Sequence, residues 1–399
     1  MTPNERNILT ATCFGHFMSH FNMLVFPALV LPLSRALNLE LSAVLPLSFW
    51  MYLLFGITAL PWGLLSDKLG AKPLLLIFYL GCGACALAVV AGLDRPQALT
   101  LALAGLGLFS GIYHPAGLGL ISKGISRMSM ALGYNGMAGN AGLAAAPILT
   151  GLFNHLFGLS SAFLLVAVLN LAGAVIMIIL PAGEPEKRPD PESSEEKRGM
   201  LAGFMVLCLC MVLVGLTYRG MSVILPSYFE LKNEALFKSL EGLQGLVASR
   251  NVAATALTSL VFLVGILGQY IGGWAAERFN PKAGYLLFHA LTVPLALGIA
   301  WTSDLPLLIL AMTYAFFLLG MQPIENTLIA RLTPDRLRHS GFGLKFILNF
   351  GIGSLAVFMV GWIERVWSLP AVFLALAGLS FLLVFCILGL FAATRQVRI

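Results

Sequence analysis

Twelve long apolar runs constrain the fold of this chain more than any other feature. A membrane-spanning helix needs about 20 mostly apolar residues. Backbone groups in lipid find hydrogen-bond partners only within a helix or a closed barrel, so apolar runs of this length predict helices. We therefore predict an all-α membrane protein with twelve transmembrane helices, over residues 8–36, 42–63, 73–92, 97–121, 130–153, 161–181, 201–228, 252–275, 283–302, 305–330, 341–363 and 370–392.

A polar stretch divides the runs into two sets of six. Residues 182–200 are rich in Pro, Glu and Lys and lack apolar periodicity, which is typical of a solvated linker. We predict two pseudo-symmetric six-helix bundles, residues 1–181 and 201–399, joined by that linker. The composition agrees, since 59% of the residues are hydrophobic and 11% are charged, whereas a soluble domain has about 25% charged residues.

The basic residues predict the orientation. With twelve spans, sixteen Lys and Arg residues fall on the side of the two termini and six on the other side. The side with the excess is expected to be cytoplasmic. We therefore predict a multi-pass protein of the inner (plasma) membrane, with both termini and the linker in the cytoplasm. This bias accounts for the net charge of +6, so no nucleic-acid partner is expected. Residues 229–251 are expected to form an outer loop with a short surface helix.

The two halves repeat. GLLSDKLGAK at residues 63–72 aligns with GWAAERFNPK at residues 273–282, an offset of 210. Parallel repeats of six helices are typical of transporters in which the solute site forms between the two halves. The alignment pairs acid with acid and base with base: Asp67 with Glu277, Lys68 with Arg278, and Lys72 with Lys282.

The loop at residues 63–72 resembles the loop between the second and third spans of the major facilitator superfamily. That loop reads G-x-x-x-D-[RK]-x-G-x-[RK], and it is matched here by Gly63, Asp67, Lys68, Gly70 and Lys72. Ala71 stands where a basic residue is usual. The resemblance covers the whole chain. It implies secondary active transport of a small-molecule solute across the lipid bilayer by rocker-switch alternating access, in a monomer without a cofactor.

Two segments resemble a narrower branch, the fosmidomycin-resistance transporters. These are GHFMSHFNMLVFPALVLPL at residues 15–33 and GIYHPAGLGLIS at residues 111–122. The branch exports small polar or amphiphilic compounds in exchange for protons, which implies export and proton coupling here. The chain departs from the branch at His20, where the branch has an acid. It also has Ala116 and Gly119 where the branch has an acid and a basic residue.

The repeated loops predict a latch between the halves. An aspartate can cap the N-terminus of a helix, where the macrodipole is positive. We expect Asp67 to reach the helix that starts near Ser340, and Glu277 the helix that starts near Ser129, in one conformation only. A simple topogenic charge cluster is the alternative. The predicted gating residues are Gly63, Asp67, Lys68, Gly70, Lys72, Glu277, Arg278 and Lys345.

Polar side chains within the spans are the candidate site. An ionisable group at membrane depth costs at least about 2.5–3.5 kcal/mol, so such groups usually face a cavity or one another. In the superfamily, the first, fourth, seventh and tenth spans line the central cavity. The predicted solute-binding residues are His16, His20, Asn22, His114, Asn135, Arg219, Gln322 and Glu325.

Several roles remain open within this set. Arg219 either binds an anionic solute through its guanidinium or extends to the lipid headgroups. Glu325, with His20 and His114, is predicted to carry protons, but Lys345 can instead hold Glu325 in an ion pair. His16 and His20 share one helix face and can bind a transition metal with His114. Our leading interpretation assigns no metal to them.

Other classes of function were weighed against solute transport. The chain has no G-x-x-x-x-G-K-[ST] nucleotide-binding loop, so energy is expected from a gradient of protons or another coupling ion. No nucleophile with an adjacent base is evident, so an enzyme is not expected. The alternatives are an uptake carrier or lipid flippase of the same fold, and a non-transporting sensor or assembly factor. The sequence does not decide the solute or the direction.

Overall fold

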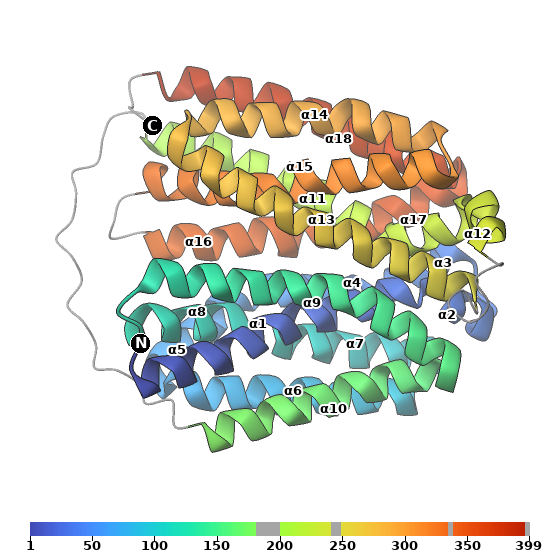
Figure 1. Ribbon diagram of the computed structural model, residues 1–399, viewed down its shortest axis with the longest axis horizontal. Helices are drawn as coiled ribbons and strands as arrows, with labels where there is room; N and C mark the ends of the chain where they lie inside the picture. Colours follow the sequence, from blue (N-terminus) through green and yellow to red (C-terminus); the bar gives the residue numbers. More distant parts are fainter. Residues whose placement is uncertain (181–199, 241–248, 334–337, 396–399) are drawn as a thin grey trace. The chain divides into compact units, whose positions relative to one another are not determined.

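The computed structural model describes residues 1–180, 200–240, 249–333 and 338–395, and these are helical apart from short turns (Figure 1). Most of the predicted linker lies outside the described residues. Ten helices are long and apolar enough to span a membrane, and two bent helix pairs raise the number to twelve if each pair is one span. The described part of the chain contains no strand, and the predicted all-α membrane fold is confirmed.

The chain forms two compact units. Of the described residues, the first unit contains 1–180, 225–230 and 249–259, and the second contains the others. The helices of the first unit are α1 (Pro3–Ala28), α2 (Val30–Leu37), α3 (Leu41–Val44), η1 (Leu45–Ser48), α4 (Phe49–Ile57), α5 (Ala59–Leu69), α6 (Ala71–Ala91), α7 (Pro96–Ser110), α8 (Tyr113–Gly124), α9 (Met128–Phe157) and α10 (Leu159–Ile179).

The second unit contains the remaining helices. Two of them, α11 and α13, each contribute one end to the first unit. A π-helical turn, Ile347–Gly351, and a 3₁₀ turn, Ile352–Leu355, interrupt the eleventh span. The helices are α11 (Met200–Lys232), α12 (Glu234–Leu240), α13 (Arg250–Arg278), α14 (Pro281–Trp301), α15 (Asp304–Leu332), α16 (Arg338–Phe346), α17 (Ala356–Val366) and α18 (Leu369–Ala393).

The first span bends because of a proline. Helices α1 and α2 meet at 48°, two residues after Pro27. Proline has no backbone N–H, so the carbonyl four residues earlier loses its helical donor. That carbonyl belongs to Met23, and the hydroxyl of Tyr52 donates to it at 3.1 Å. The Met23 carbonyl therefore has a hydrogen-bond partner at the bend, and this bond links α4 to α1.

The two halves of the chain pack alike. In the first unit α6 packs against α7 and α10, and in the second unit α14 packs in the same way against α15 and α18. These helices occupy equivalent positions in the two sets of six. Large apolar side chains are exposed in both units; Leu101 of the first unit is 76% exposed and Trp301 of the second is 75% exposed. Such surfaces suit lipid rather than water.

Candidate functional site

Three histidines form a cluster in the first unit. His16 and His20 lie one turn apart on α1, and their Nε2 atoms are 3.1 Å apart. His114 comes from α8, and its ring lies 5.2 Å from that of His16 and 5.5 Å from that of His20, between centroids. His114 is buried, while His16 and His20 are partly exposed. The three predicted site histidines therefore come together.

Asn135 of α9 holds this cluster in place. Its backbone carbonyl accepts a hydrogen bond from Nδ1 of His16 at 2.8 Å. Its side-chain amide donates to the hydroxyl of Tyr113 at 2.8 Å, and that hydroxyl donates to the carbonyl of Thr12 at 2.7 Å. Asn135 is fully buried. In this geometry it positions His16 and Tyr113 instead of making the solute contact that the sequence predicts.

The glycines of α9 allow this arrangement. A Cβ at Gly142 would lie 2.2 Å from the carbonyl oxygen of Phe17, and a Cβ at Gly139 would lie 2.7 Å from Nε2 of His16. Only glycine permits such close approach. Gly133 and Gly136 on the same helix have nothing within 4 Å of a built Cβ. The glycine run therefore contains two positions that set the distance between α9 and α1.

A buried ion pair forms the corresponding cluster in the second unit. Glu325 of α15 is fully buried, and Lys345 of α16 lies 2.8 Å from it. The hydroxyl of Tyr285 donates to the carboxylate at 2.7 Å, and the amide of Asn349 donates to it at 3.2 Å. Lys345 also donates to Asn326 at 2.6 Å. The sequence-based alternative in which Lys345 holds Glu325 is the one that this geometry adopts.

The local backbone contributes to this pair. Asn349 lies in the π-helical turn Ile347–Gly351, and single π turns within helices occur frequently at functional sites. His289, which its place in the ninth span suggested was a lipid-side residue without a function, is 1% exposed and packs edge-on against Tyr285 at 4.7 Å between centroids. The Glu325 carboxylate is thus enclosed by residues of α14, α15 and the eleventh span.

Arg219 is buried and does not reach the surface. It is 2% exposed, and its guanidinium lies 5.8 Å from the centre of the Tyr218 ring. Extension to lipid headgroups needs an exposed side-chain end, so the geometry argues against that alternative. Arg219 belongs to the second unit, as does the Glu325–Lys345 pair.

Two predicted solute-binding residues have partners within their own units. Asn22 is fully buried; its amide donates to Ser110 at 3.4 Å and its carbonyl accepts from Asn170 at 3.1 Å. The side-chain carbonyl of Gln322 accepts from Gln269 at 3.0 Å. Asn22 therefore acts as a packing residue here, and Gln322 links α15 to α13.

The loop at residues 63–72 makes a turn that needs glycine. Gly70, between α5 and α6, has a φ of 89°, a conformation that costs little only for glycine. In the repeat, Asn280 stands at this position and caps α14 by accepting from the backbone N–H groups of Lys282 and Ala283. The helix after the first loop therefore starts at a glycine with positive φ, whereas the helix after the second loop starts at an asparagine that caps it.

The last lysine of each loop makes the same contact. Lys72 donates to the carbonyl of Leu180 at 3.3 Å, and Lys282 donates to the hydroxyl of Thr394 at 3.1 Å. Leu180 and Thr394 are the C-caps of α10 and α18, the sixth helix of each half. A cation is stabilised at a helix C-terminus, where the macrodipole is negative. These lysines therefore have a local structural role that sequence analysis missed.

The predicted latch remains a prediction. Within its own unit Asp67 forms an exposed ion pair with Lys123 at 3.2 Å. The side chains of Ser129 and Ser340, near the two expected capping sites, lie outside the described residues. Of the other gating residues, Gly63 lies within α5 and Lys68 near its C-terminal end, and Glu277 and Arg278 are the last two residues of α13.

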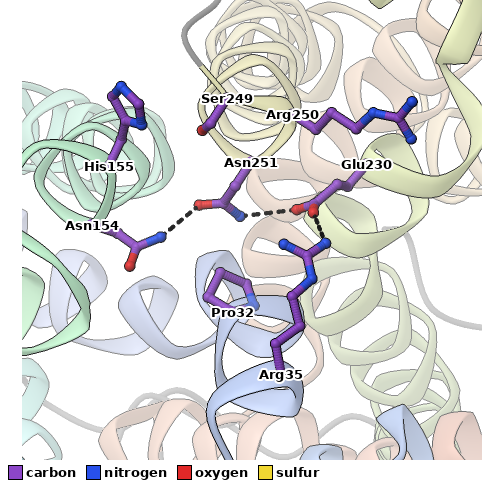
Figure 2. Close-up of a pocket in the computed structure, with 8 residues that line it drawn as sticks. All are labelled: Pro32, Arg35, Asn154, His155, Glu230, Ser249, Arg250 and Asn251. Atoms are coloured by element: carbon purple, nitrogen blue, oxygen red, sulfur yellow. Dashed lines mark hydrogen bonds and ion pairs between the residues drawn. The ribbon is translucent and has the colours of Figure 1, made fainter.

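A second network surrounds a cavity of about 400 Å³ in the first unit (Figure 2). Glu230, near the end of α11, is 2% exposed in its side chain and pairs with Arg35 of α2. Asn251 of α13 donates to Glu230 at 3.1 Å and to the carbonyl of Ala28 at 3.0 Å. Asn154 of α9 donates to Asn251 at 3.3 Å. Figure 2 shows these side chains as one chain of contacts.

This network corrects one expectation. Residues 229–251 were predicted to be an outer loop, but α11 continues to Lys232 and buries Glu230, and α13 begins at Arg250. Helix α12, Glu234–Leu240, corresponds to the predicted short helix, and residues 241–248 lie outside the described part. An acid at the end of an apolar run resembles a loop residue, but here Arg35 compensates its charge.

The fold defines a polytopic α-helical membrane protein built from two related halves. The chain belongs to the Major Facilitator Superfamily, whose sequence model matches residues 12–249 and 207–398. This membership confirms the family expected from the loop at residues 63–72. It supports secondary transport, and it is a family of transporters rather than enzymes. No curated protein sequence matches the chain.

Solved transporter structures share the fold. A bacterial homolog of the human lysosomal transporter Spinster, inward-facing and occupied, has a TM-score of 0.71 at 14% identity and covers 99% of this chain and 98% of its own. A mutant of the peptide transporter POT with sulfate scores 0.77 at 15% identity, with 98% and 95% covered. The human organic anion transporter MFSD10 scores 0.67 at 17% identity, with 97% and 100% covered. At these identities the likeness establishes the fold alone.

Proposed function

We propose that the chain is a secondary active transporter that moves a small anionic or amphiphilic solute across the inner membrane by alternating access, coupled to protons. Membership of the superfamily supports transport. The single observation that carries the anionic and proton-coupled part is the buried Glu325–Lys345 pair. Joint binding of anion and proton at this pair is symport, which under an inward proton gradient drives uptake, the alternative to the export that the resemblance to the fosmidomycin-resistance branch implies.

The pair offers a direct route to coupling. Lys345 retains 10% exposure in its side chain, whereas Glu325 has none, so an incoming anion meets the ammonium group first. An anion that takes over Lys345 leaves Glu325 as an unpaired buried charge, which costs about 3–5 kcal/mol. Uptake of one proton by Glu325 removes that charge. Binding of the anion and binding of the proton thereby favour each other.

Neighbouring groups suit this exchange. The hydroxyl of Tyr285 and the amide of Asn349 keep the Glu325 carboxyl in place when Lys345 turns to the solute. Arg219 supplies a second buried cation in the same unit. Among the structures that share the fold, POT is described with sulfate and MFSD10 as an organic anion transporter, which supports an anionic solute here.

We assign the Arg35–Glu230 pair to the extracellular end, because the basic residues favour cytoplasmic termini. The pair and its two asparagines join α1, α2 and α9 to the ends of α11 and α13. All of these residues belong to the first unit, and the network holds the ends of these helices together there.

The test is solute-triggered proton movement in proteoliposomes with a pH dye inside. A panel of candidate anions and amphiphilic drugs is added outside, for the wild type, Glu325→Gln and the control Glu234→Gln, which removes an exposed acid of α12. We expect a pH change with at least one compound in the wild type and in the control, and its loss in Glu325→Gln.

Other results point elsewhere. A pH change that survives in Glu325→Gln moves coupling away from this residue. The absence of any pH change contradicts proton coupling, and transfer of labelled lipids then tests the flippase alternative. Failure of every labelled solute and lipid to move favours the non-transporting sensor or assembly factor.

A further inference from the structure

The histidine cluster of the first unit forms a donor set that the coupling mechanism at Glu325 does not use. His16, His20 and His114 each offer one ring nitrogen, and these nitrogens all lie within 4.8 Å of one another. Among the described residues, this is the group of three or more His, Cys, Asp or Glu side chains found close enough to hold a metal ion. Neutral imidazoles suit Zn²⁺, Cu²⁺ and Ni²⁺.

The hydrogen bonds of His16 fix its tautomer. A carbonyl oxygen can only accept, so Nδ1 of His16 must donate its proton to the carbonyl of Asn135. In a neutral imidazole this leaves the lone pair on Nε2, which faces His20 at 3.1 Å. Metal-binding histidines usually donate their other ring nitrogen to a backbone carbonyl or a carboxylate, which orients the ring. His16 has this arrangement without a metal.

Aromatic side chains pack against two of the three rings and limit their movement. Tyr113 stacks on His16 at 5.1 Å between centroids, and Phe55 packs edge-on against His114 at 5.7 Å. A Cβ at Gly139 would lie 2.7 Å from Nε2 of His16, so the absent side chain leaves that nitrogen room. Preorganised donors lose little freedom when an ion binds, which favours affinity.

We propose that His16, His20 and His114 bind one divalent transition-metal ion, with a fourth coordination position for water or an anionic group. In a tetrahedral site with Zn–N bonds of about 2.0–2.1 Å, ligand nitrogens lie about 3.3 Å apart. The Nε2 atoms of His16 and His20 are 3.1 Å apart, near this value. The ion replaces the proton that Nε2 of His20 donates to His16, and that proton moves to Nδ1 of His20 or to solvent. The most distant pair has to approach by about 1.5 Å, so ion binding requires a movement of the rings. Partial exposure of His16 and His20 keeps the fourth position accessible.

Metal binding and proton transfer compete at this cluster. Coordination uses a lone pair on each imidazole, so a bound ion removes His20 and His114 from the proton-carrying role expected from sequence. The contrasting state is a hydrogen-bonded His16–His20 pair beside His114, with no ion. Metal binding to the purified protein separates the two, and its readout does not depend on transport. The proposed function can therefore fail or succeed independently of this site.

The experiment uses the full chain, purified in detergent with an affinity tag that contains no histidine, and stripped with a chelator. Zn²⁺ binding is measured by equilibrium dialysis with elemental analysis, and Co²⁺ by its visible absorption. We expect one ion per chain. His16→Asn, His20→Asn and His114→Asn should each weaken binding on the order of 100-fold or more, since even outer-shell partners contribute 10–100-fold. His155→Asn, an exposed histidine of α9, is the matched control and should leave binding unchanged.

Two further measurements keep the proposal falsifiable if the histidine variants fold poorly. Gly139→Ala removes no ligand but crowds Nε2 of His16, so it should weaken Zn²⁺ binding, whereas Gly136→Ala should not. X-ray absorption of the Zn²⁺-loaded wild type should show three imidazoles at about 2.0 Å. The proposal is overturned if the wild type binds Zn²⁺ no more tightly than a variant that carries His16→Asn, His20→Asn and His114→Asn together, or if the absorption spectrum shows one imidazole or none.

Discussion

Removal of the Lys345 charge should destabilise the protein far more than removal of the whole ion pair. In Lys345→Met the fully buried carboxylate of Glu325 keeps only two neutral donors, those of Tyr285 and Asn349. Breaking a buried pair from one side costs about 3–5 kcal/mol. The two remaining hydrogen bonds place the expected loss near the lower end, about 3 kcal/mol.

The double variant Glu325→Gln/Lys345→Met is the informative comparison. Glutamine can still bond to Tyr285 and Asn349, and no charge is left in the interior, so the expected loss is about 1 kcal/mol or less. Glu325→Gln alone should lie between, at about 1–3 kcal/mol, because Lys345 keeps its contact with Asn326 and some exposure. The penalty of Lys345→Met should also shrink at lower pH, because a protonated Glu325 needs no countercharge.

The assay is denaturant unfolding of the purified protein in detergent micelles, followed by the reactivity of the buried thiols Cys82 and Cys210. We expect the loss of unfolding free energy in the double variant to be at least about 2 kcal/mol smaller than the sum of the losses in the two single variants. Independent sites add to within about 0.5 kcal/mol. Additivity to that precision would show that the two side chains do not interact, and the coupling mechanism built on them would lose its basis.

Three other substitutions test the packing and the helix ends by the same unfolding assay. Gly142→Ala places a Cβ 2.2 Å from the carbonyl of Phe17 and should cost about 1–3 kcal/mol, whereas Gly133→Ala, with open space around it, should be neutral or stabilising; equal effects would contradict the close approach of α1 and α9. Lys282→Met removes the cation from the end of α18 and should cost about 1 kcal/mol; an unchanged free energy of unfolding would mean that the contact contributes nothing. Glu230→Ala leaves the buried amide of Asn251 without this acceptor and should cost about 1–3 kcal/mol; a loss under about 0.5 kcal/mol would show that water replaces the carboxylate.

The spans and the repeat were predictable because they are local properties of the chain. A long apolar run in lipid forms a helix regardless of which helices pack against it. The similar loops at residues 63–72 and 273–282 indicate the duplication directly. The length of the first run, 8–36, exceeds one span, and Pro27 accounts for the bend found there. The donor that the bend requires, the hydroxyl of Tyr52, comes from another helix, and no local pattern identifies it.

The candidate site was predictable in part. The spacing of His16 and His20 places them on one face, but the approach of His114 depends on how α8 packs against α1. Glu325 and Lys345 were open to pairing because a lone ion at that depth is costly, and the structure pairs them. Glu230 was missed because an acid at the end of an apolar run looks like a loop residue. Its partner Arg35 lies 195 positions away.

The repeat marks the lysines at the ends of the two loops, but it does not identify their partners. Lys72 and Lys282 occupy equivalent positions in the repeat, and such retention in both halves suggests a shared contact. The contact itself, with the last turn of the sixth helix in each half, depends on tertiary packing. The sequence placed Arg219 and Asn22 together as solute-binding candidates. The structure shows that both are buried and that the side chain of Asn22 is bonded to neighbouring helices.

The most direct test of the account is uphill transport driven by a proton gradient alone. Proteoliposomes that contain the wild type and no nucleotide are given a pH step, with a labelled anion that triggers proton movement present at equal concentration on both sides. We predict that the anion accumulates on one side, that a protonophore abolishes the accumulation, and that Glu325→Gln does not support it. Equal concentrations that persist under the pH step would contradict secondary active transport coupled to protons.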